Sequence, residues 1–416
     1  MAEGSSLSGR RYDNGFGTSY RGVSVVAGAR TPFGRISGSL AGVNATQLGT
    51  VVGKAAIERA KIDPETIDQL VFANVHPSSV DAVFLPRHIT LRCGLRRHTP
   101  AMLVQRICGS GIETIATAAD QICTARARAV LVGGADSTSL TPTVSFGGRD
   151  GYRFGASPGF KDLFFEALTD SFAGIPLAIT AENLAEEYAL SREEVDVYAA
   201  RSQHEAARAT ETGILQEEIV PVIAGNGIRL NGRKKEFIRD ETLRSTTTLQ
   251  GLAGLPPVFK KDGVQTAGNS SALADGAAAL VVAGDEEIER QGLSSLGRVV
   301  SVGVCGVDPE VMGIGPVPAI HIALEMAGLT VADIDCWEIN EAFGAQIVAV
   351  EKALDLDREK LNVNGGAIAF GHPLAATGGR LSLTLLHELR RSGLRYGVAS
   401  ACIGGGQGIA MVFEVA

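Results

Sequence analysis

The sequence lacks a hydrophobic run long enough to cross a membrane, because no stretch reaches the roughly 20 consecutive apolar residues that a spanning helix needs. It also lacks an excess of basic residues, since 38 Lys and Arg stand against 46 Asp and Glu, for a net charge of -8. General nucleic-acid binding requires a basic surface, so this balance argues against that class of protein. A local basic patch for an anionic ligand stays compatible, because net charge does not describe how charge is distributed.

Paired cysteines are missing as well. The six cysteines are scattered, with no C-x-x-C pair and no zinc-ligand spacing, so we expect a reduced intracellular protein without a bound metal ion. The N-terminal segment has no apolar stretch typical of a secretory signal, and the chain does not end in a peroxisomal Ser-Lys-Leu. We predict a cytoplasmic location, and Arg10, Arg11 and Arg21 leave a mitochondrial one open.

Glycine, in contrast, is abundant, with 51 residues spread through apolar segments. This spread predicts tight turns and close backbone approaches rather than disorder. A chain of 416 residues is long for one compact core, so more than one domain is expected.

Three stretches of the chain differ in their pattern of apolar and polar residues. Residues 22–150 and 266–416 alternate apolar strand-like runs with amphipathic helical patterns, which is typical of layered α/β structure. Residues 151–265 are more polar and contain a charged helical stretch over 181–213, so we expect an inserted loop domain that carries ligand contacts. Residues 1–21 are polar and rich in Gly and Ser, and we expect a flexible N-terminal extension.

The two α/β stretches also resemble each other. In the first, an apolar strand leads to Cys108-Gly-Ser-Gly, then to a helix of small residues and a further strand. In the second, an apolar run leads to Gly371-His372-Pro373, then to a helix and a strand that ends at Cys402. This match suggests an internal duplication. If the halves are equivalent, Cys108 and His372 occupy corresponding corners, each at the start of a helix.

Cys108 is the candidate nucleophile. A strand followed by Cys-Gly-Ser-Gly and a helix predicts a sharp turn with the thiol at a helix N-terminus, where free N–H groups and the dipole favour the thiolate. A lone cysteine is more often a buried apolar side chain. The surrounding glycines and the partners in the second half favour the reactive interpretation.

Three residues of the second half are candidate partners. His372, between Gly and Pro, is either a turn residue or a base that deprotonates Cys108 and then donates to an oxyanion. Cys402 supplies a second thiol that can exchange a proton with the carbon alpha to a thioester, or it pairs with Cys108 in a disulfide. Asn340 follows an apolar strand and either orients a water molecule or caps the next helix.

Together these segments resemble the thiolase family of 3-ketoacyl-CoA thiolases and acetyl-CoA acetyltransferases, from about Val23 to the C-terminus. The resemblance implies a duplicated, layered αβαβα architecture with an inserted loop domain. The motifs that carry it are Arg30-Thr-Pro-Phe-Gly34, Ile107-Cys-Gly-Ser-Gly111, Thr180-Ala-Glu-Asn183, Pro257-Val-Phe-Lys-Lys-Asp-Gly263, Thr266-Ala-Gly-Asn-Ser-Ser271, Asn340-Glu-Ala-Phe343, Gly371-His-Pro373 and Cys402-Ile-Gly-Gly-Gly-Gln-Gly408.

The resemblance also implies a mechanism. Cys108 attacks the 3-keto carbon of a ketoacyl-CoA, Cys402 protonates the departing acetyl-CoA enolate, and CoA then releases the shortened acyl group. In the reverse direction, Cys402 deprotonates acetyl-CoA for a Claisen condensation. His372 and a water held by Asn340 form one oxyanion hole, and the N–H groups of Cys108 and Gly404 form the other.

For the ligand, the resemblance implies coenzyme A as a substrate, with no permanently bound cofactor. Arg244 matches the arginine beside the adenine end of CoA, and Thr247 and Ser271 match further CoA-contacting positions. The resemblance also implies a homodimer or homotetramer. At 176–177 the sequence has Pro-Leu, closer to the Pro-Met of broad-range degradative members than to the His-Met of acetoacetyl-specific ones, which favours the former group.

Two alternatives stay open. Ketoacyl synthases and hydroxymethylglutaryl-CoA synthases resemble thiolases in fold, and fold alone does not separate them. Cys402 is the discriminating residue, because ketoacyl synthases use a pair of histidines and lack this thiol. A catalytically silent thiolase-like protein, acting as a CoA-binding or assembly subunit, is the second alternative, and the presence of all four catalytic residues argues against it.

Overall fold

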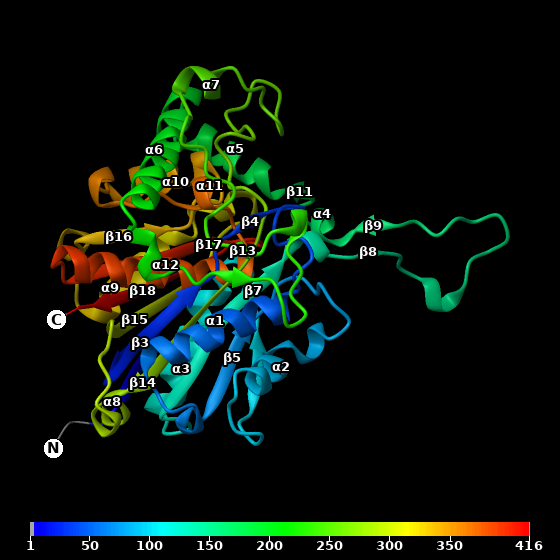
Figure 1. Ribbon diagram of the computed structural model, residues 1–416. Helices are drawn as coiled ribbons and strands as arrows, with labels where there is room; N and C mark the ends of the chain where they lie inside the picture. The colour runs from blue at the N-terminus through cyan, green and yellow to red at the C-terminus, as the bar shows by residue number, and fades with distance from the viewer. Residues whose placement is uncertain (1–3, 416) are drawn as a thin grey trace.

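A computed structural model describes residues 4–415, and its body consists of two similar α/β halves (Figure 1). A 12-stranded sheet runs through both halves in the order β16-β17-β18-β15-β3-β14-β7-β5-β6. The strands of this path are β3 (Val23–Arg30), β5 (Gln69–Ala73), β6 (Ala101–Val104), β7 (Ala129–Ser137), β14 (Ala274–Gly284), β15 (Gly297–Gly306), β16 (Cys336–Ile339), β17 (Tyr396–Ile403) and β18 (Gln407–Glu414).

The sheet divides where β15 meets β3. These two strands share only the pairs Gly297↔Val25 and Arg298↔Ser24, so each side behaves as a separate half-sheet. The halves repeat one pattern: β5 and β7 are parallel and β14 runs antiparallel to β7, while β16 and β17 are parallel and β18 runs antiparallel to β17. The predicted internal duplication is therefore visible in the strand directions.

The helices complete five layers. The central layer is α3 (Ser110–Cys123) and α12 (Leu374–Ser392), which contact each other and strands of both half-sheets. The outer face of the first half-sheet is covered by α1 (Ala45–Ala60) and α2 (Leu85–Arg92). The second half-sheet is covered by α9 (Pro316–Ala327), with α10 (Gly344–Leu354) beside it. The predicted αβαβα order is confirmed.

Glycines let the two central helices approach closely. A Cβ on Gly111 would lie 2.3 Å from the backbone nitrogen of Gly379, and a Cβ on Gly378 would lie 2.4 Å from that of Ile112. No larger residue fits this crossing without moving a backbone. The contact brings together the starts of α3 and α12, the two corners at which the sequence places Cys108 and His372.

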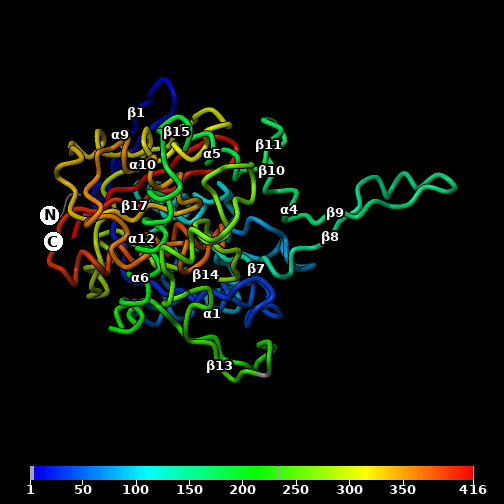
Figure 2. Tube along the Cα trace, turned by 90° about the horizontal axis from the view of Figure 1, so that it is seen from above, coloured from blue at the N-terminus to red at the C-terminus, as the bar shows by residue number. Residues whose placement is uncertain are grey.

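The loop domain lies above the second half and sends out a long hairpin. Its main helices are α5 (Leu177–Glu187) and α6 (Arg192–Glu211), so the single charged stretch predicted over 181–213 is two helices. The chain turns between them because Ser191 caps α6 through a capping box with Glu194. Both views show the hairpin between β8 (Thr143–Val144) and β9 (Lys161–Asp162) projecting from the body (Figures 1 and 2).

The remaining elements of the loop region are short. They are α4 (Leu163–Ala167), β10 (Thr169–Asp170), β11 (Ile175–Pro176), β12 (Val222–Ile223), β13 (Glu236–Phe237) and α7 (Leu249–Ala253). Across residues 4–415, no helix combines the length and the apolar character that crossing a membrane demands.

The N-terminal segment differs from the expected flexible extension. It forms an antiparallel hairpin of β1 (Ser6–Tyr12) and β2 (Gly15–Arg21), and β2 pairs with β15. A Cβ on Gly15 would lie 2.0 Å from the carbonyl oxygen of Val304, and one on Gly17 would lie 2.5 Å from Cγ of Met326 in α9. The glycines that suggested flexibility are therefore what lets this strand pack so closely.

Candidate active site

Cys108 lies in a tight turn between β6 and α3. A single 3-10 turn over Ile107–Gly109 runs directly into the helix at Ser110. Ile107 has a φ of 43°, a left-handed conformation that is unfavourable for a β-branched residue, so the turn stores strain immediately before the thiol. The backbone N–H of Arg106 donates to Ser110 Oγ at 2.8 Å and helps to hold this turn.

The thiol of Cys108 is protonated in the resting site. It is 6% exposed, and burial raises its pKa to about 12, although the N–H groups of Gly404 and of Cys108 itself donate to the sulfur and lower the pKa. Asp136 adds a small raising effect. The N–H groups thus favour the thiolate, in the predicted direction, but desolvation outweighs them and the net shift of the pKa is upward.

His372 lies one residue before Pro373, at the start of α12, and its ring orientation is defined by hydrogen bonds. The Thr377 hydroxyl donates to the carbonyl oxygen of Pro373 at 2.9 Å, so Nδ1 of His372 carries the hydrogen that it shares with Thr377 Oγ1 at 2.6 Å. Nε2 then carries the lone pair, 3.3 Å from Nδ2 of Asn340. This tautomer leaves Nε2 free to accept a proton.

The imidazole of His372 is neutral at physiological pH. Burial, with a smaller contribution from the Arg380 guanidinium, lowers its pKa to about 3. The helix α12 that begins beside His372 contacts the turn that carries Cys108. A neutral thiol and a neutral imidazole therefore lie on adjoining elements of one site, and an imidazole of this kind can take up the proton of a thiol.

Asn340 follows β16 and presents a free acceptor to the site. Its backbone N–H donates to the carbonyl oxygen of Ser400 at 2.9 Å, which fixes the strand end. Its Oδ1 is buried and has no hydrogen-bond partner among residues 4–415. A buried amide oxygen requires a partner, so this atom is suited to a water or a ligand group.

The neighbouring Glu341 anchors this segment and was not singled out from the sequence. Its carboxylate accepts hydrogen bonds from Tyr198 Oη at 3.0 Å, Ser202 Oγ at 2.7 Å, Asn362 Nδ2 at 2.9 Å and the backbone N–H of Ile368 at 3.0 Å. These donors come from α6 and from the segment that leads to His372. A charged residue directly after Asn340, in an otherwise apolar stretch, was the available signal.

Cys402 lies at the end of β17 and is completely buried. It packs against Met312 and Ala342, with Leu177 and Phe343 next to them. Burial raises the pKa of this thiol, and its proximity to Cys108 raises the pKa further. Both cysteines are free thiols in the structure, so the alternative of a disulfide between them is not realised.

Gly404 lies in the turn between β17 and β18. Its N–H donates to the sulfur of Cys108, and a Cβ at this position would lie 3.4 Å from Cδ1 of Leu177. The next two residues, Gly405 and Gly406, have φ of 85° and 82°, which favour glycine. The glycine-rich turn thus directs a backbone N–H at the candidate nucleophile.

A cavity of about 370 Å³ leads toward these groups from the loop domain. Arg244 and Thr247 line it, and Ser271 lies between two lining residues, Ser270 and Ala272. The carbonyl oxygen of Ala272 accepts a hydrogen bond from the N–H of His372 at 2.9 Å, so the cavity wall is joined directly to the site. The other lining residues are Arg35, Ile36, Gln203, Glu241, Thr242, Leu243, Leu252, Ala267, Gly268, Leu273 and Ile368.

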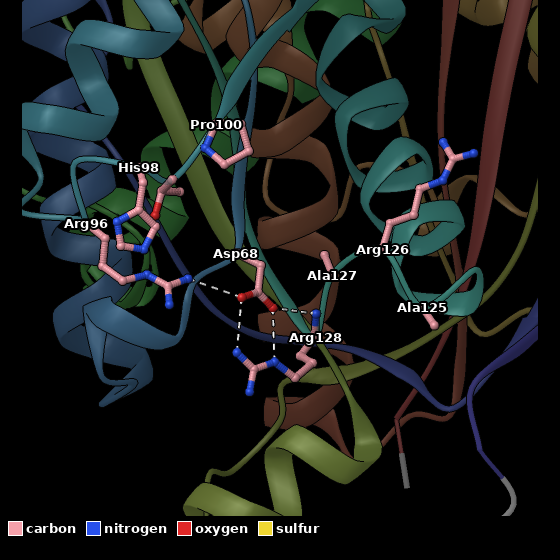
Figure 3. Close-up of a pocket in the computed structure, with 9 residues that line it drawn as sticks. Asp68, Arg96, His98, Pro100, Ala125, Arg126, Ala127 and Arg128 are labelled. Carbon is pink, nitrogen blue, oxygen red and sulfur yellow. Dashed lines mark hydrogen bonds and ion pairs between the residues drawn. The ribbon is translucent and has the colours of Figure 1, made fainter.

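A second cavity, of about 440 Å³, lies at the amino ends of strands of the first half-sheet (Figure 3). Asp68, which precedes β5, accepts hydrogen bonds from Arg96 at 3.2 Å and from Arg128 at 3.1 Å. Burial acts to raise the pKa of Asp68, but these arginines outweigh it and lower the pKa. The side chain of Arg126 points away from this cluster (Figure 3). The cavity adjoins the amino ends of β5, β6 and β7, whereas Cys108 follows the carboxyl end of β6, so the cavity is separate from the site.

Comparisons with known proteins agree with this geometry. A family model described as "Thiolase, N-terminal domain" matches residues 23–286, and one described as "Thiolase, C-terminal domain" matches residues 293–415. The chain is 46% identical over 394 residues to the human mitochondrial 3-ketoacyl-CoA thiolase, covering 95% of this chain and 98% of that protein. It is 44% identical over 397 residues to beta-ketothiolase BktB of Cupriavidus necator, with 95% and 99% covered.

Solved structures give the same result. The crystal structure of the human mitochondrial 3-ketoacyl-CoA thiolase matches with a TM-score of 0.92 and 46% identity, covering 95% of this chain and 98% of that chain. Its complex with CoA matches equally well. Two family models spanning nearly the whole chain, relatives above 40% identity and a shared fold lead to one conclusion: this protein belongs to the thiolase family.

Proposed function

We propose that this protein is a thiolase that cleaves 3-ketoacyl-CoA with CoA into acetyl-CoA and a shortened acyl-CoA, or runs the reverse Claisen condensation, through an acyl group on Cys108. The single observation that carries the proposal is the buried thiol of Cys108 with the Gly404 N–H on its sulfur, in a site that also holds a neutral His372 and a second thiol, Cys402. The printed names of the relatives, 3-ketoacyl-CoA thiolase and acetyl-CoA acetyltransferase, support this reaction.

The first half of the reaction uses all three groups. Cys108 Sγ forms a bond to the 3-keto carbon while its proton passes to His372 Nε2, and the carbonyl oxygen becomes an alkoxide. As the carbonyl forms again, the bond between the 3-keto carbon and the alpha carbon breaks. The electron pair leaves on the acetyl-CoA enolate, and the Cys402 thiol protonates its carbon. Cys402 becomes a thiolate, and the acyl group stays on Cys108.

The second half returns the protons. CoA attacks the acyl group on Cys108, and the proton of its thiol goes to the Cys402 thiolate. His372 returns its proton to the departing Cys108 sulfur, so the enzyme ends in its starting state. In the condensation direction each step reverses, and Cys402 removes the proton from acetyl-CoA.

Two groups of donors stabilise the negative oxygens. The N–H groups of Cys108 and Gly404 lie beside the Cys108 sulfur, and we place the alkoxide of the acyl half next to that sulfur, within reach of both donors. The enolate oxygen of acetyl-CoA binds near His372, together with a water held by the unpartnered Oδ1 of Asn340. Backbone and amide donors of this kind contribute about 3 kcal/mol each to the stabilisation of a transition state.

CoA enters through the cavity of the loop domain. Arg244 at its mouth takes the adenine end, Thr247 and Ser271 contact the remainder, and the thioester reaches the wall at Ala272 beside His372. The crystal structure of the human relative in complex with CoA supports CoA as the ligand. No permanently bound cofactor takes part in the proposed steps.

Arg244→Ala should raise the KM for CoA about 10-fold and leave kcat nearly unchanged. The reason is that the adenine end of CoA, to which we assign Arg244, takes no part in bond making or breaking, so loss of this arginine weakens ground-state and transition-state binding equally. Steady-state thiolysis at varied CoA concentration measures both constants. Arg239→Ala is the matched control, because Arg239 is also exposed but lines a different cavity. Equal effects of the two substitutions would contradict the assigned CoA site.

The whole proposal is tested by thiolysis of a series of ketoacyl-CoA substrates, from acetoacetyl-CoA to long chains. We expect turnover, and Pro176 and Leu177 favour substrates longer than acetoacetyl-CoA. CoA binding with no turnover at any chain length would contradict the proposed thiolase activity and favour the alternative, a catalytically silent CoA-binding or assembly subunit. We further propose a homodimer or homotetramer in the cytoplasm; the mammalian relatives carry the word mitochondrial in their names.

A further inference from the structure

We propose that the N-terminal hairpin of β1 and β2 is a positioning element that holds the Gly404 turn against Cys108. This inference rests on the proposed function, because it assigns a role to the Gly404 N–H. The thiolase family model begins its match at residue 23, so the hairpin lies entirely outside the matched region. It is therefore an addition to the part of the chain that carries the chemistry.

The hairpin supplies a strand that β15 otherwise lacks. Along one edge, β15 pairs with β18 over most of its length. Along the other edge its neighbour is β3, which pairs only with the first two residues of β15, Gly297 and Arg298. From Ser301 to Cys305 the pairing on this side comes from β2. Without the hairpin, the half of β15 that leads toward the catalytic turn would be a free edge, and a free edge frays.

The tip of the hairpin reaches the catalytic turn through two backbone hydrogen bonds. The carbonyl oxygen of Asn14, at the tip, accepts from the N–H of Gly306 at 2.8 Å. The next residue, Val307, donates its N–H to the carbonyl oxygen of Gly406 at 2.8 Å. Gly406 lies two residues after Gly404, in the same tight turn.

The contact between these segments leaves no room for a side chain. A Cβ on Gly406 would lie 2.3 Å from the carbonyl oxygen of Val307, and Gly306 also pairs with Gln407 on the opposite side of β15. The end of β15 is therefore held between β18 and the hairpin. A shift of this end displaces Gly406 and, with it, the N–H that Gly404 donates to Cys108.

The hairpin itself is fixed to the body of the second half. It lies beside α9 (Figure 2), where Gly17 packs against Met326 and Ile322. Arg10 of β1 forms an ion pair with Glu325 of the same helix. These contacts fix the hairpin to α9, so its tip can hold the turn that contains Gly404 and Gly406 in place.

The test uses the full-length protein with Gly15→Ala. The added Cβ would lie 2.0 Å from the carbonyl oxygen of Val304 and so pushes the tip away from β15. Gly9→Ala is the matched control in the same hairpin, because its Cβ would meet nothing closer than the carbonyl oxygen of Gly17, at 3.8 Å. Gly17→Ala is the second variant, since it meets flexible side chains of α9 and should fold even if Gly15→Ala does not.

Two quantities are measured in each variant: kcat and KM in thiolysis, and the pH midpoint of iodoacetamide alkylation at Cys108. We expect Gly15→Ala to lower kcat about 3- to 10-fold with an unchanged KM for CoA, as a partly misaligned donor requires. The alkylation midpoint should move to higher pH, because the Gly404 N–H favours the thiolate. Gly17→Ala should change both in the same direction, and Gly9→Ala should change neither.

The outcomes separate this proposal from the proposed function. If the wild-type protein shows no thiolysis, the proposed function fails, while the alkylation midpoint still reports on the hairpin. If the wild-type protein is active, and Gly15→Ala and Gly17→Ala lower only the melting temperature and leave kcat and the midpoint unchanged, the hairpin has a merely structural role and the positioning proposal is overturned.

Discussion

Cys108→Ala should lower kcat for thiolysis at least about 10⁴-fold, because no other group in the site can form the acyl intermediate. Cys402 is buried among apolar side chains and lacks the Gly404 N–H that Cys108 has on its sulfur, so it does not replace the nucleophile. The substitution should also remove labelling at position 108 by a thiol alkylator. Thiolysis rates and peptide mass spectrometry of the alkylated protein measure the two losses.

Cys93→Ala is the matched control for this substitution. Cys93 is also buried, and burial raises its pKa to about 12, but it follows α2, on the outer face of the first half-sheet. We expect its removal to leave kcat within about 2-fold of wild type, since a buried thiol away from the active site acts as a small apolar side chain. Turnover by Cys108→Ala above about 1% of wild type would exclude an acyl group on Cys108 as the main route.

Cys402→Ala should separate the two kinds of chemistry in the site. Carbon–carbon cleavage and condensation should fall about 10³-fold, because the enolate carbon loses its proton donor. Acyl transfer needs no enolate, and CoA that arrives as its thiolate needs no proton acceptor in the site. Exchange of the acetyl group between acetyl-CoA and labelled CoA should therefore continue through Cys108 and His372, at a rate that rises with pH. The exchange rate and the thiolysis rate of acetoacetyl-CoA are measured on one preparation. Their ratio should rise in Cys402→Ala if Cys402 acts only in carbon–carbon chemistry.

A parallel loss of exchange and thiolysis in Cys402→Ala would mean that the substitution disturbs Cys108 itself. The matched control is Cys336→Ala, a buried thiol on β16 that lies in the core rather than in the site. Any general cost of removing a buried sulfur from the second half should appear in that variant too. Retained exchange in Cys402→Ala, with intact thiolysis in Cys336→Ala, is the expected pattern.

Much of the architecture could be predicted from the sequence, because it depends on periodicity. The alternation of apolar strands with amphipathic helices gave the layered halves, and the matching glycine corners paired Cys108 with His372 before any fold was in view. The structure confirms the layers, and α3 and α12 meet at Gly111 and Gly378. Short-range patterns of this kind are visible in one sequence because their physical cause is local.

The protonation states could not be predicted in this way. The helix start at Cys108 accounts for the N–H of Cys108 itself, but the second donor is Gly404, from a turn in the second half of the chain, and burial raises the pKa to about 12. For His372, too, burial governs the charge, because it lowers the pKa of the imidazole. Polarity alone also misjudged residues 1–21, because glycine permits close strand packing as readily as it permits disorder.

The crossing of α3 and α12 has a consequence for how this protein can change over time. Duplicated halves can diverge where a substitution in one half is compensated by a substitution in the other. At this crossing the contact is between backbone atoms, so no side chain is available to compensate. A methyl group at Gly111 or Gly378 would push the backbones of α3 and α12 apart and displace both helix starts at once. The nucleophile and the base would then lose their alignment together. This narrow crossing therefore limits how far the two halves can drift apart while still acting as one catalyst.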